Sequence, residues 1–207
     1  MESFITLIQK GGFIMIPILL CSLLTLTIIL ERMAMLRQSR LIPSELVKRI
    51  QSFSLEKKDS LLDYCAHHAN IPLVTIVKTM VVNAGLPHQE SVELIKATGR
   101  QLAKSLDKGL FMLELIAAVT PLMGLLGTVL GMIDVFDTIV KMGVGQAEHL
   151  SAGISKALIT TVAGLIVAIP SLAAYSMLSR KVEGLVALMD RHVTDLHGKI
   201  YGIHIER

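Results

Sequence analysis

Three long apolar runs dominate the pattern of hydrophobic and polar positions along the chain. Residues 12–30 and 115–133 each hold 19 positions without a charged side chain, and residues 157–179 hold 23. About 20 apolar residues are needed for a helix to cross about 30 Å of hydrocarbon. The pattern therefore predicts an all-α integral membrane protein with three transmembrane helices, which we place at residues 12–35, 110–140 and 153–179.

The polar segments that flank these runs are predicted to be helical as well. Residues 36–109 read as short helices separated at Pro43, Pro72 and residues 85–87, and the helical rhythm of residues 88–108 runs on into the second span. Residues 180–207 predict an amphipathic helix whose apolar stripe packs against these helices or against a neighbouring subunit. This stripe consists of Val182, Leu185, Val186, Met189, Val193, Leu196 and Ile200.

The distribution of positive charge predicts an orientation in the membrane. Of 20 Lys and Arg residues, only Lys10, Lys141 and Lys156 lie before the first span or between the second and third. Positive segments stay in the cytoplasm, so we expect residues 1–11 and the link 141–152 in the periplasm, and residues 36–109 and 180–207 in the cytoplasm. The first run ends at Glu31 and Arg32 rather than at a small-residue cleavage site, which predicts a retained helix.

Small residues form one face on each of the second and third spans. Glycines with this spacing allow another helix backbone to approach closely, and Pro121 removes a backbone hydrogen bond from the second span. The Thr128 hydroxyl lies on the same face of the second span as these glycines. The packing residues that we predict are Gly124, Gly127 and Gly131 on the second span, and Gly153, Ala157, Thr161, Gly164 and Ala168 on the third.

Four strings of sequence resemble one known family. They are "PILLCSLLTLTIILER", "LDKGL", "TPLMGLLGTVLGMIDVF" and "GISKALITTVAGLIVAIPSLAAY". They are similar to the ExbB/TolQ/MotA proton-channel family, most of all to its three-span ExbB and TolQ branch. The resemblance implies a subunit of an ion-driven motor (stator) in the bacterial inner membrane, with five copies in a ring around an ExbD- or TolR-like partner. Such a complex turns the proton or sodium motive force into mechanical work, through TonB or through TolA.

The partner in this family carries a membrane aspartate, and the pattern of charges here fits that division of labour. Ion transfer at mid-membrane needs an ionisable or coordinating group, and residues 115–133 and 157–179 contain no carboxylate. By the resemblance, Thr128 and Thr161 face the partner's aspartate; alternatively, each hydroxyl bonds to a carbonyl of its own helix. Thr160 replaces an alanine of the best-known members, and the Thr160–Thr161 pair resembles sodium-driven stators. Transported H⁺ is the expected ion, and Na⁺ stays open because hydroxyl oxygens suit a hard cation.

Lys156 stands where familiar ExbB and TolQ sequences carry a glutamate. At about 1.5 Å per residue, Asp134 lies about 9 Å outward of Thr128, and Lys156 about 7.5 Å outward of Thr161. We therefore expect Lys156 to pair with Asp134, or with Asp137, at the outer mouth of the pore. Two alternatives are that Lys156 reaches the membrane interface or that it contacts the partner's acid.

The remaining polar residues give no catalytic pattern. We find no nucleophile, phosphate loop or metal constellation, which indicates that the protein is not an enzyme and needs no cofactor besides the transported ion. Glu114 could mark an ion exit or simply reach interfacial water, and His192, His197 and His204 are expected to be solvated. An alternative function is a non-conducting structural scaffold of the same architecture, which the cationic Lys156 would permit.

Overall fold

The computed structural model describes residues 12–142 and 147–202, and the regular structure of these residues is entirely helical. The chain divides into two compact units. The membrane unit comprises residues 1–31 and 109–177, and the polar unit comprises residues 32–108 and 178–207.

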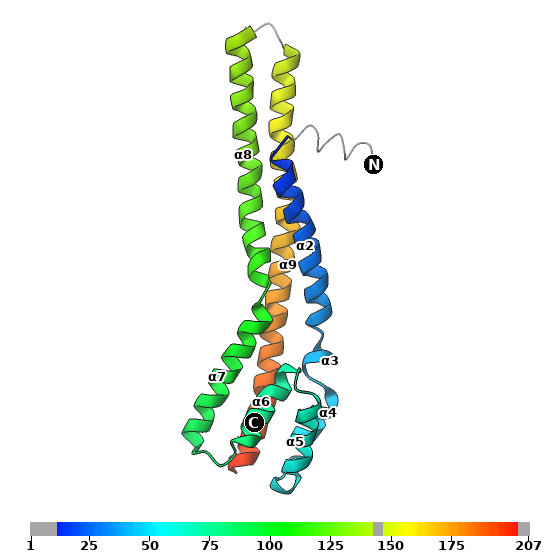
Figure 1. Cartoon of the computed structure of the whole chain (residues 1–207), viewed down its shortest axis with the longest axis vertical. Coiled ribbons are helices and arrows are strands. Elements are labelled where there is room, and N and C mark those ends of the chain that lie inside the picture. Colours follow the sequence, from blue (N-terminus) through cyan, green and yellow to red (C-terminus); the bar gives the residue numbers. More distant parts are fainter. Residues whose placement is uncertain (1–11, 143–146, 203–207) are drawn as a thin grey trace. The chain divides into compact units, whose positions relative to one another are not determined.

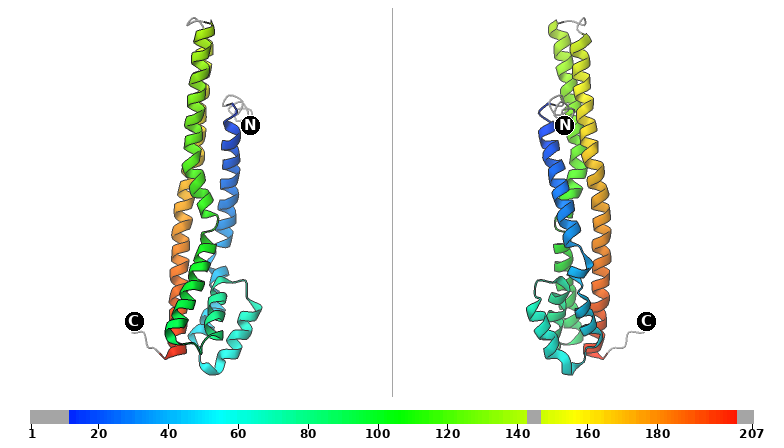
Figure 2. Two further views of the ribbon diagram at one scale, coloured as in Figure 1. Left: turned by 60° about the vertical axis from the view of Figure 1, so that its left-hand side comes forward. Right: turned by 90° about the vertical axis from the view of Figure 1, so that its right-hand side faces the viewer.

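Three long helices make up the membrane unit. They are α2 (Met15–Met35), α8 (Leu110–Met142) and the first part of α9 (Ala147–Tyr201), and they lie side by side (Figures 1 and 2). All three are long and apolar enough to cross a membrane, which confirms the predicted three-span, all-α membrane class. Large apolar side chains such as Phe13 and Val140 are 80% and 85% exposed. Such a surface is suited to lipid or to other helices rather than to water.

Helix α9 is continuous from the membrane unit into the polar unit. Its 55 residues make a helix about 82 Å long, which is much longer than the hydrocarbon thickness. The predicted amphipathic helix after the third span is therefore the second half of α9. The two helices that flank the predicted link 141–152 extend into it, since α8 ends at Met142 and α9 begins at Ala147.

The polar unit combines short helices with the end of α9. The predicted breaks coincide with helix starts, because Pro43 and Pro87 directly precede α4 and α7, and Pro72 is the first residue of α6. Proline suits such positions because its fixed φ fits a first turn and its missing N–H has no helical partner there. The helices are α3 (Gln38–Leu41), α4 (Ser44–Gln51), η1 (Leu55–Lys57), α5 (Lys58–His67), α6 (Pro72–Val82) and α7 (His88–Asp107).

The apolar stripe of α9 supplies part of the core of the polar unit. Leu196 is completely buried, as are Leu46 and Ile50 of α4 and Leu73 of α6. A cation fixes the end of α4 against the same part of α9: Lys199 Nζ donates to the carbonyls of Ile50 and Gln51 at 2.9 Å each and to Asp195 Oδ2 at 3.0 Å. A lysine at this place satisfies carbonyls that the helix end leaves without partners.

The predicted continuation of residues 88–108 into the second span is wrong. Helix α7 ends at Asp107 and α8 begins at Leu110. Lys108 is extended, with φ −56° and ψ 124°, and Gly109 has φ +95°, which side chains with a Cβ rarely adopt. The glycine therefore breaks a helix that the apolar rhythm alone would carry through.

The expectation that His197 is solvated is also wrong. Its ring lies 5.0 Å from the ring of His88 and 4.6 Å from that of Tyr201, and its Nε2 is buried without a hydrogen-bond partner among the described residues. Burial lowers the pKa of His197, and nearby His88 lowers it further. The Tyr201 hydroxyl donates to the Leu86 carbonyl at 2.9 Å, which ties the end of α9 to the start of α7. His204 lies outside the described residues.

Candidate functional site

The site begins with a very close approach of the α8 and α9 backbones. A Cβ atom on Gly124 would lie 2.9 Å from the Thr160 carbonyl oxygen and 3.0 Å from Thr161 Cα. On Gly164 it would lie 2.7 Å from the Thr120 carbonyl oxygen. Ordinary contacts of a Cβ are longer, so only glycine allows the two helices to come this near.

The same approach continues towards the connected ends of the two helices. A Cβ on Gly131 would lie 2.9 Å from the Cβ of Ala157, and one on Gly153 would overlap the Val135 side chain. Pro121 lies inside α8 without ending it. The structure thus brings together the small residues for which the sequence predicted a packing role.

Four oxygen atoms gather where the two small faces meet. The hydroxyls of Thr128 and Thr161 contact each other across the helix pair. Thr128 Oγ1 lies 3.2 Å from the Ala157 carbonyl, and Thr161 Oγ1 lies 3.2 Å from the Gly124 carbonyl. Thr128 Oγ1 also lies 3.3 Å from the Gly124 carbonyl oxygen of its own helix. We call these two hydroxyls and two carbonyls the threonine cluster.

The threonine cluster can exchange hydrogen bonds with an added polar group. Each hydroxyl carries a single proton and two lone pairs, and each carbonyl can accept more than one bond. Both threonine side chains are half-buried rather than enclosed. The contacts of Thr161 cross to α8, whereas the alternative interpretation expected each hydroxyl to bond within its own helix.

Thr160, which we expected to face the ion pathway together with Thr128 and Thr161, is buried between α8 and α9. It is only 1% exposed, and its side chain fills the space above Gly127. Its hydroxyl lies 2.7 Å from the Ala157 carbonyl and 3.3 Å from the Gly124 carbonyl, so it contacts both carbonyls of the threonine cluster from the buried side. The most buried line of α9 consequently runs through Thr160 rather than Thr161. This line consists of Ala157, Thr160, Gly164, Ala168 and Ser171.

Two charges that lie nearer than the threonine cluster to the connected ends of α8 and α9 form an ion pair. Lys156 Nζ lies 3.3 Å from Asp134 Oδ2, while Asp137 lies beside Lys141 at 4.0 Å. The side chains of Lys156 and Asp134 are 41% and 64% exposed. Gly12, with φ +73°, packs against the lysine, where a Cβ would lie 2.7 Å from Cε. The location of this pair at a pore mouth stays a prediction.

A hydroxyl pair between α2 and α9 is a feature that the sequence reasoning missed. Thr25 Oγ1 and Ser171 Oγ lie 2.9 Å apart, and the two residues are 6% and 0% exposed. The only signal in the sequence was a hydroxyl near the middle of each apolar run, and several hydroxyls fit that description. Glu114, by contrast, is exposed on α8 and takes no part in the threonine cluster.

Comparison with known proteins identifies the family of this helix arrangement. The sequence model of the MotA/TolQ/ExbB proton channel family matches residues 68–191, which include the whole threonine cluster and Lys156. The chain belongs to the MotA/TolQ/ExbB family. The predicted resemblance is therefore confirmed, and the protein is a membrane protein of a proton-channel family.

Several relatives in this family carry ExbB names. The biopolymer transport protein exbB1 of Vibrio cholerae is 29% identical over 201 residues, which cover 92% of this chain and 85% of the relative. A putative biopolymer transport protein, ExbB-like 1 of Synechocystis, is 31% identical over 173 residues, 82% of this chain and 68% of the relative. ExbB of Aquifex aeolicus is 44% identical over 83 residues, 40% of this chain and 56% of the relative. These matches support the ExbB and TolQ branch.

Proposed function

We propose that this protein is the ring-forming subunit of an ion-driven motor in the bacterial inner membrane. An ExbD- or TolR-like partner with one membrane span supplies the aspartate that binds the ion. The complex converts the proton motive force into mechanical work for TonB-dependent transport or for a Tol-like envelope process. Membership of a proton channel family and the biopolymer transport names of relatives support this proposal.

The observation that carries the proposal is the threonine cluster within apolar helix segments that contain no acid. Neither residues 115–133 nor residues 157–179 contain a carboxylate. A partner's carboxylate could accept a hydrogen bond from Thr128 or Thr161, and its protonated form could donate one to the Gly124 or Ala157 carbonyl. One surface would thus serve both protonation states. A potential of 100 mV is worth about 2.3 kcal/mol per charge moved.

We propose protons as the transported ion, with sodium as the alternative outcome of the test. Two hydroxyls and two carbonyls are oxygen ligands that also suit a hard cation. The additional hydroxyl that suggested sodium is that of Thr160, which contacts both carbonyls of the threonine cluster but is only 1% exposed, whereas Thr128 and Thr161 are half-buried. This burial favours protons.

The proposed arrangement in the membrane follows the distribution of positive charge. The amino terminus and the α8–α9 connection would lie in the periplasm, with the polar unit and the carboxyl terminus in the cytoplasm. Lys156 and Asp134 would then be on the periplasmic side of the threonine cluster. An isolated lysine there would repel an entering cation, and pairing with Asp134 offsets its charge.

The test is ion flux through the purified complex. The chain is co-expressed with the product of a neighbouring gene that encodes one amino-terminal span containing an aspartate, and the complex is reconstituted into lipid vesicles. At an imposed potential, a pH-sensitive dye reports proton entry and a sodium-sensitive dye reports sodium entry, in buffers with and without sodium. The chain alone and a complex with Asp→Asn in the partner are the controls.

The outcomes separate the candidate functions. Flux that needs the partner's aspartate and persists without sodium supports the proposal. Flux that requires sodium would identify sodium as the transported ion instead. An intact complex that conducts neither ion contradicts the motor function and supports the structural scaffold. The cationic Lys156 beside the pathway is the observation that favours this second candidate.

A further inference from the structure

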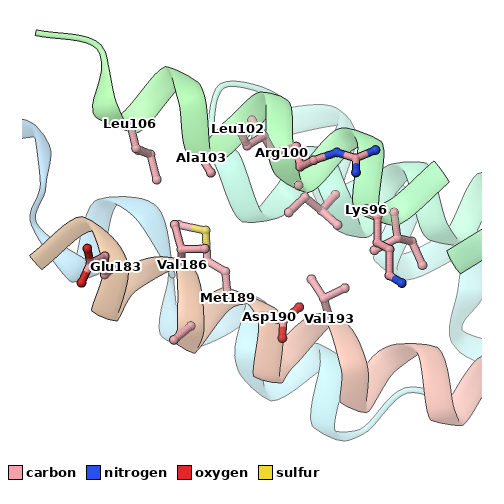
Figure 3. Close-up of a pocket in the computed structure, with 14 residues that line it drawn as sticks. Lys96, Arg100, Leu102, Ala103, Leu106, Glu183, Val186, Met189, Asp190 and Val193 are labelled. Carbon is pink, nitrogen blue, oxygen red and sulfur yellow. The ribbon is translucent and has the colours of Figure 1, made fainter. Parts of the chain in front are cut away.

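The start of α7 and the end of α9 come together within the polar unit. The two helices border an apolar groove of about 590 Å³, and Lys96 of α7 lies at the same end of this groove as Val193 of α9 (Figure 3). His88 lies eight residues before Lys96, and His197 lies four residues after Val193. The fold thus brings together two histidines from distant parts of the sequence.

The separation of these two rings is the one that a shared metal ion requires. The ring centres of His88 and His197 are 5.0 Å apart, and the ring planes are inclined by 61°. In a tetrahedral zinc site with Zn–N distances of about 2.0–2.1 Å, the centres of two imidazole rings are about 5 Å apart. Each ring can bind through either of its nitrogens, so rotation of the side chains can bring both rings to one ion without movement of the helices.

His197 carries a nitrogen without a partner. Its Nε2 is buried and accepts or donates no hydrogen bond within residues 12–142 and 147–202. A buried polar atom in this state is costly, and a water molecule or an ion beside it removes the cost. Burial lowers the pKa of His197, and nearby His88 lowers it further. The ring is therefore neutral at pH 7, which is the form that binds a metal ion.

The histidine pair is open on one side and closed on another. His88 is exposed, so an ion can reach the pair from solvent. Tyr201 closes the other side, since its ring lies 4.6 Å from that of His197 and 5.5 Å from that of His88, and its hydroxyl donates to the Leu86 carbonyl. The described residues place no third His, Cys, Asp or Glu beside the pair. Water would therefore complete the coordination of a bound ion.

We propose that His88 and His197 bind one divalent transition-metal ion such as Zn²⁺, which clamps the start of α7 to the end of α9. Imidazole nitrogens suit Zn²⁺, Cu²⁺ and Ni²⁺, whereas Mg²⁺ and Ca²⁺ need oxygen ligands. Structural zinc sites are closed by four protein ligands, so a site with two histidines binds its ion reversibly. Both histidines belong to the polar unit, and the inference does not rest on the proposed ion pathway.

The test is zinc binding by the full chain, purified in detergent through a tag without histidines and freed of metal with a chelator. Isothermal titration calorimetry with ZnCl₂ is performed at about pH 7.5, above the ordinary histidine pKa of about 6.5. Zn²⁺ should bind to the wild type, and His88→Gln or His197→Gln should weaken the binding at least tenfold. His67→Gln is the matched control, because His67 is an exposed histidine of the same unit outside the pair, and it should leave the affinity unchanged.

A second measurement needs no variant that could misfold. With Cu²⁺ in place of Zn²⁺, electron paramagnetic resonance identifies the imidazole nitrogens bound to the ion. Two imidazoles are expected in the wild type and in His67→Gln, and one in each variant of the pair. Heat unfolding adds a readout of the clamp: Zn²⁺ should raise the unfolding temperature of the wild type, because it binds only the folded pair, and should not raise that of His197→Gln.

Three results would overturn the inference. They are a wild type that does not bind Zn²⁺, an affinity that His88→Gln and His197→Gln leave unchanged, and a Cu²⁺ spectrum without two imidazole nitrogens. The first of these would mean that water alone satisfies the buried nitrogen of His197. Zinc binding is measured on the chain without its partner and without ion flux, so its failure leaves the proposed motor function untouched.

Discussion

Substitution of Gly164 by alanine tests the close approach of α8 and α9 directly. The new Cβ would lie 2.7 Å from the Thr120 carbonyl oxygen and 3.2 Å from Gly124 Cα. Ordinary contact begins at 3.4 Å, so the backbones would have to separate by about 0.7 Å, the difference between 2.7 and 3.4 Å. Both obstructing atoms belong to the backbone, and neither can swing aside as the end of a flexible side chain could.

The expected magnitude combines two opposing effects. Forcing an extra carbon into a packed contact costs about 1–3 kcal/mol, while alanine favours a helix over glycine by about 1 kcal/mol. Gly164→Ala should therefore destabilise the protein by about 0–2 kcal/mol. Gly184 lies in the same helix, and a Cβ added there would meet no atom within 4 Å, so Gly184→Ala should show only the stabilising effect. The predicted difference between the variants is about 1–3 kcal/mol.

The assay is heat unfolding in detergent micelles, followed by the helical circular dichroism signal, with both variants and the wild type measured in one series. Comparing two glycines of α9 cancels most of the difference in helix propensity. A Gly164→Ala variant that is as stable as Gly184→Ala, or more stable, would show that α8 and α9 do not approach this closely.

Three more predictions concern the free energy of unfolding. Lys156→Met and Asp134→Asn should show a coupling of only about 0.2–1 kcal/mol in a double-mutant cycle, because the pair is exposed; additive effects would exclude the pairing. Thr25→Val and Ser171→Ala should be coupled by about 0.6–2 kcal/mol through their buried hydrogen bond, and zero coupling in the same cycle would contradict it. Because the pKa of His197 is lowered in the folded protein, the unfolded chain binds a proton at this histidine more readily. The contribution of neutral His197 to the free energy of unfolding is therefore complete above about pH 6.5 and decreases as the pH falls below that value. A thermal melt at about pH 7.5 and about pH 5.5, on either side of the ordinary histidine pKa, should show this loss, and His197→Gln should reduce it.

The sequence predicts the parts of the fold that depend on local pattern. Charge-free runs define the three spans, and prolines define the starts of α4, α6 and α7. The pairing of Lys156 with Asp134 could also be expected, because two antiparallel helices with level threonines place both charges at nearly the same height. These inferences need only helix geometry and the thickness of the membrane.

Other features depend on contacts that no local pattern contains. Thr160 and Thr161 are about 100° apart around α9, and both lie beside small residues, so the rotation of the helix against α8 decides which one is buried. The hydrogen bond between Thr25 and Ser171 joins positions 146 residues apart. The break before α8 depends on the positive φ of Gly109, which a helical rhythm of apolar residues conceals.

Flux through a complex with both hydroxyls removed tests whether the threonine cluster faces a moving ion. Thr128→Val with Thr161→Val keeps the shape of the side chains and removes their hydrogen bonds. Thr138→Val is the matched control, since Thr138 lies on α8 and its hydroxyl bonds only to the Asp134 carbonyl among the described residues. With the complex intact, we predict at least a tenfold loss of flux, about 1.4 kcal/mol in the barrier, and no loss in the control. Wild-type flux in the double variant would contradict it.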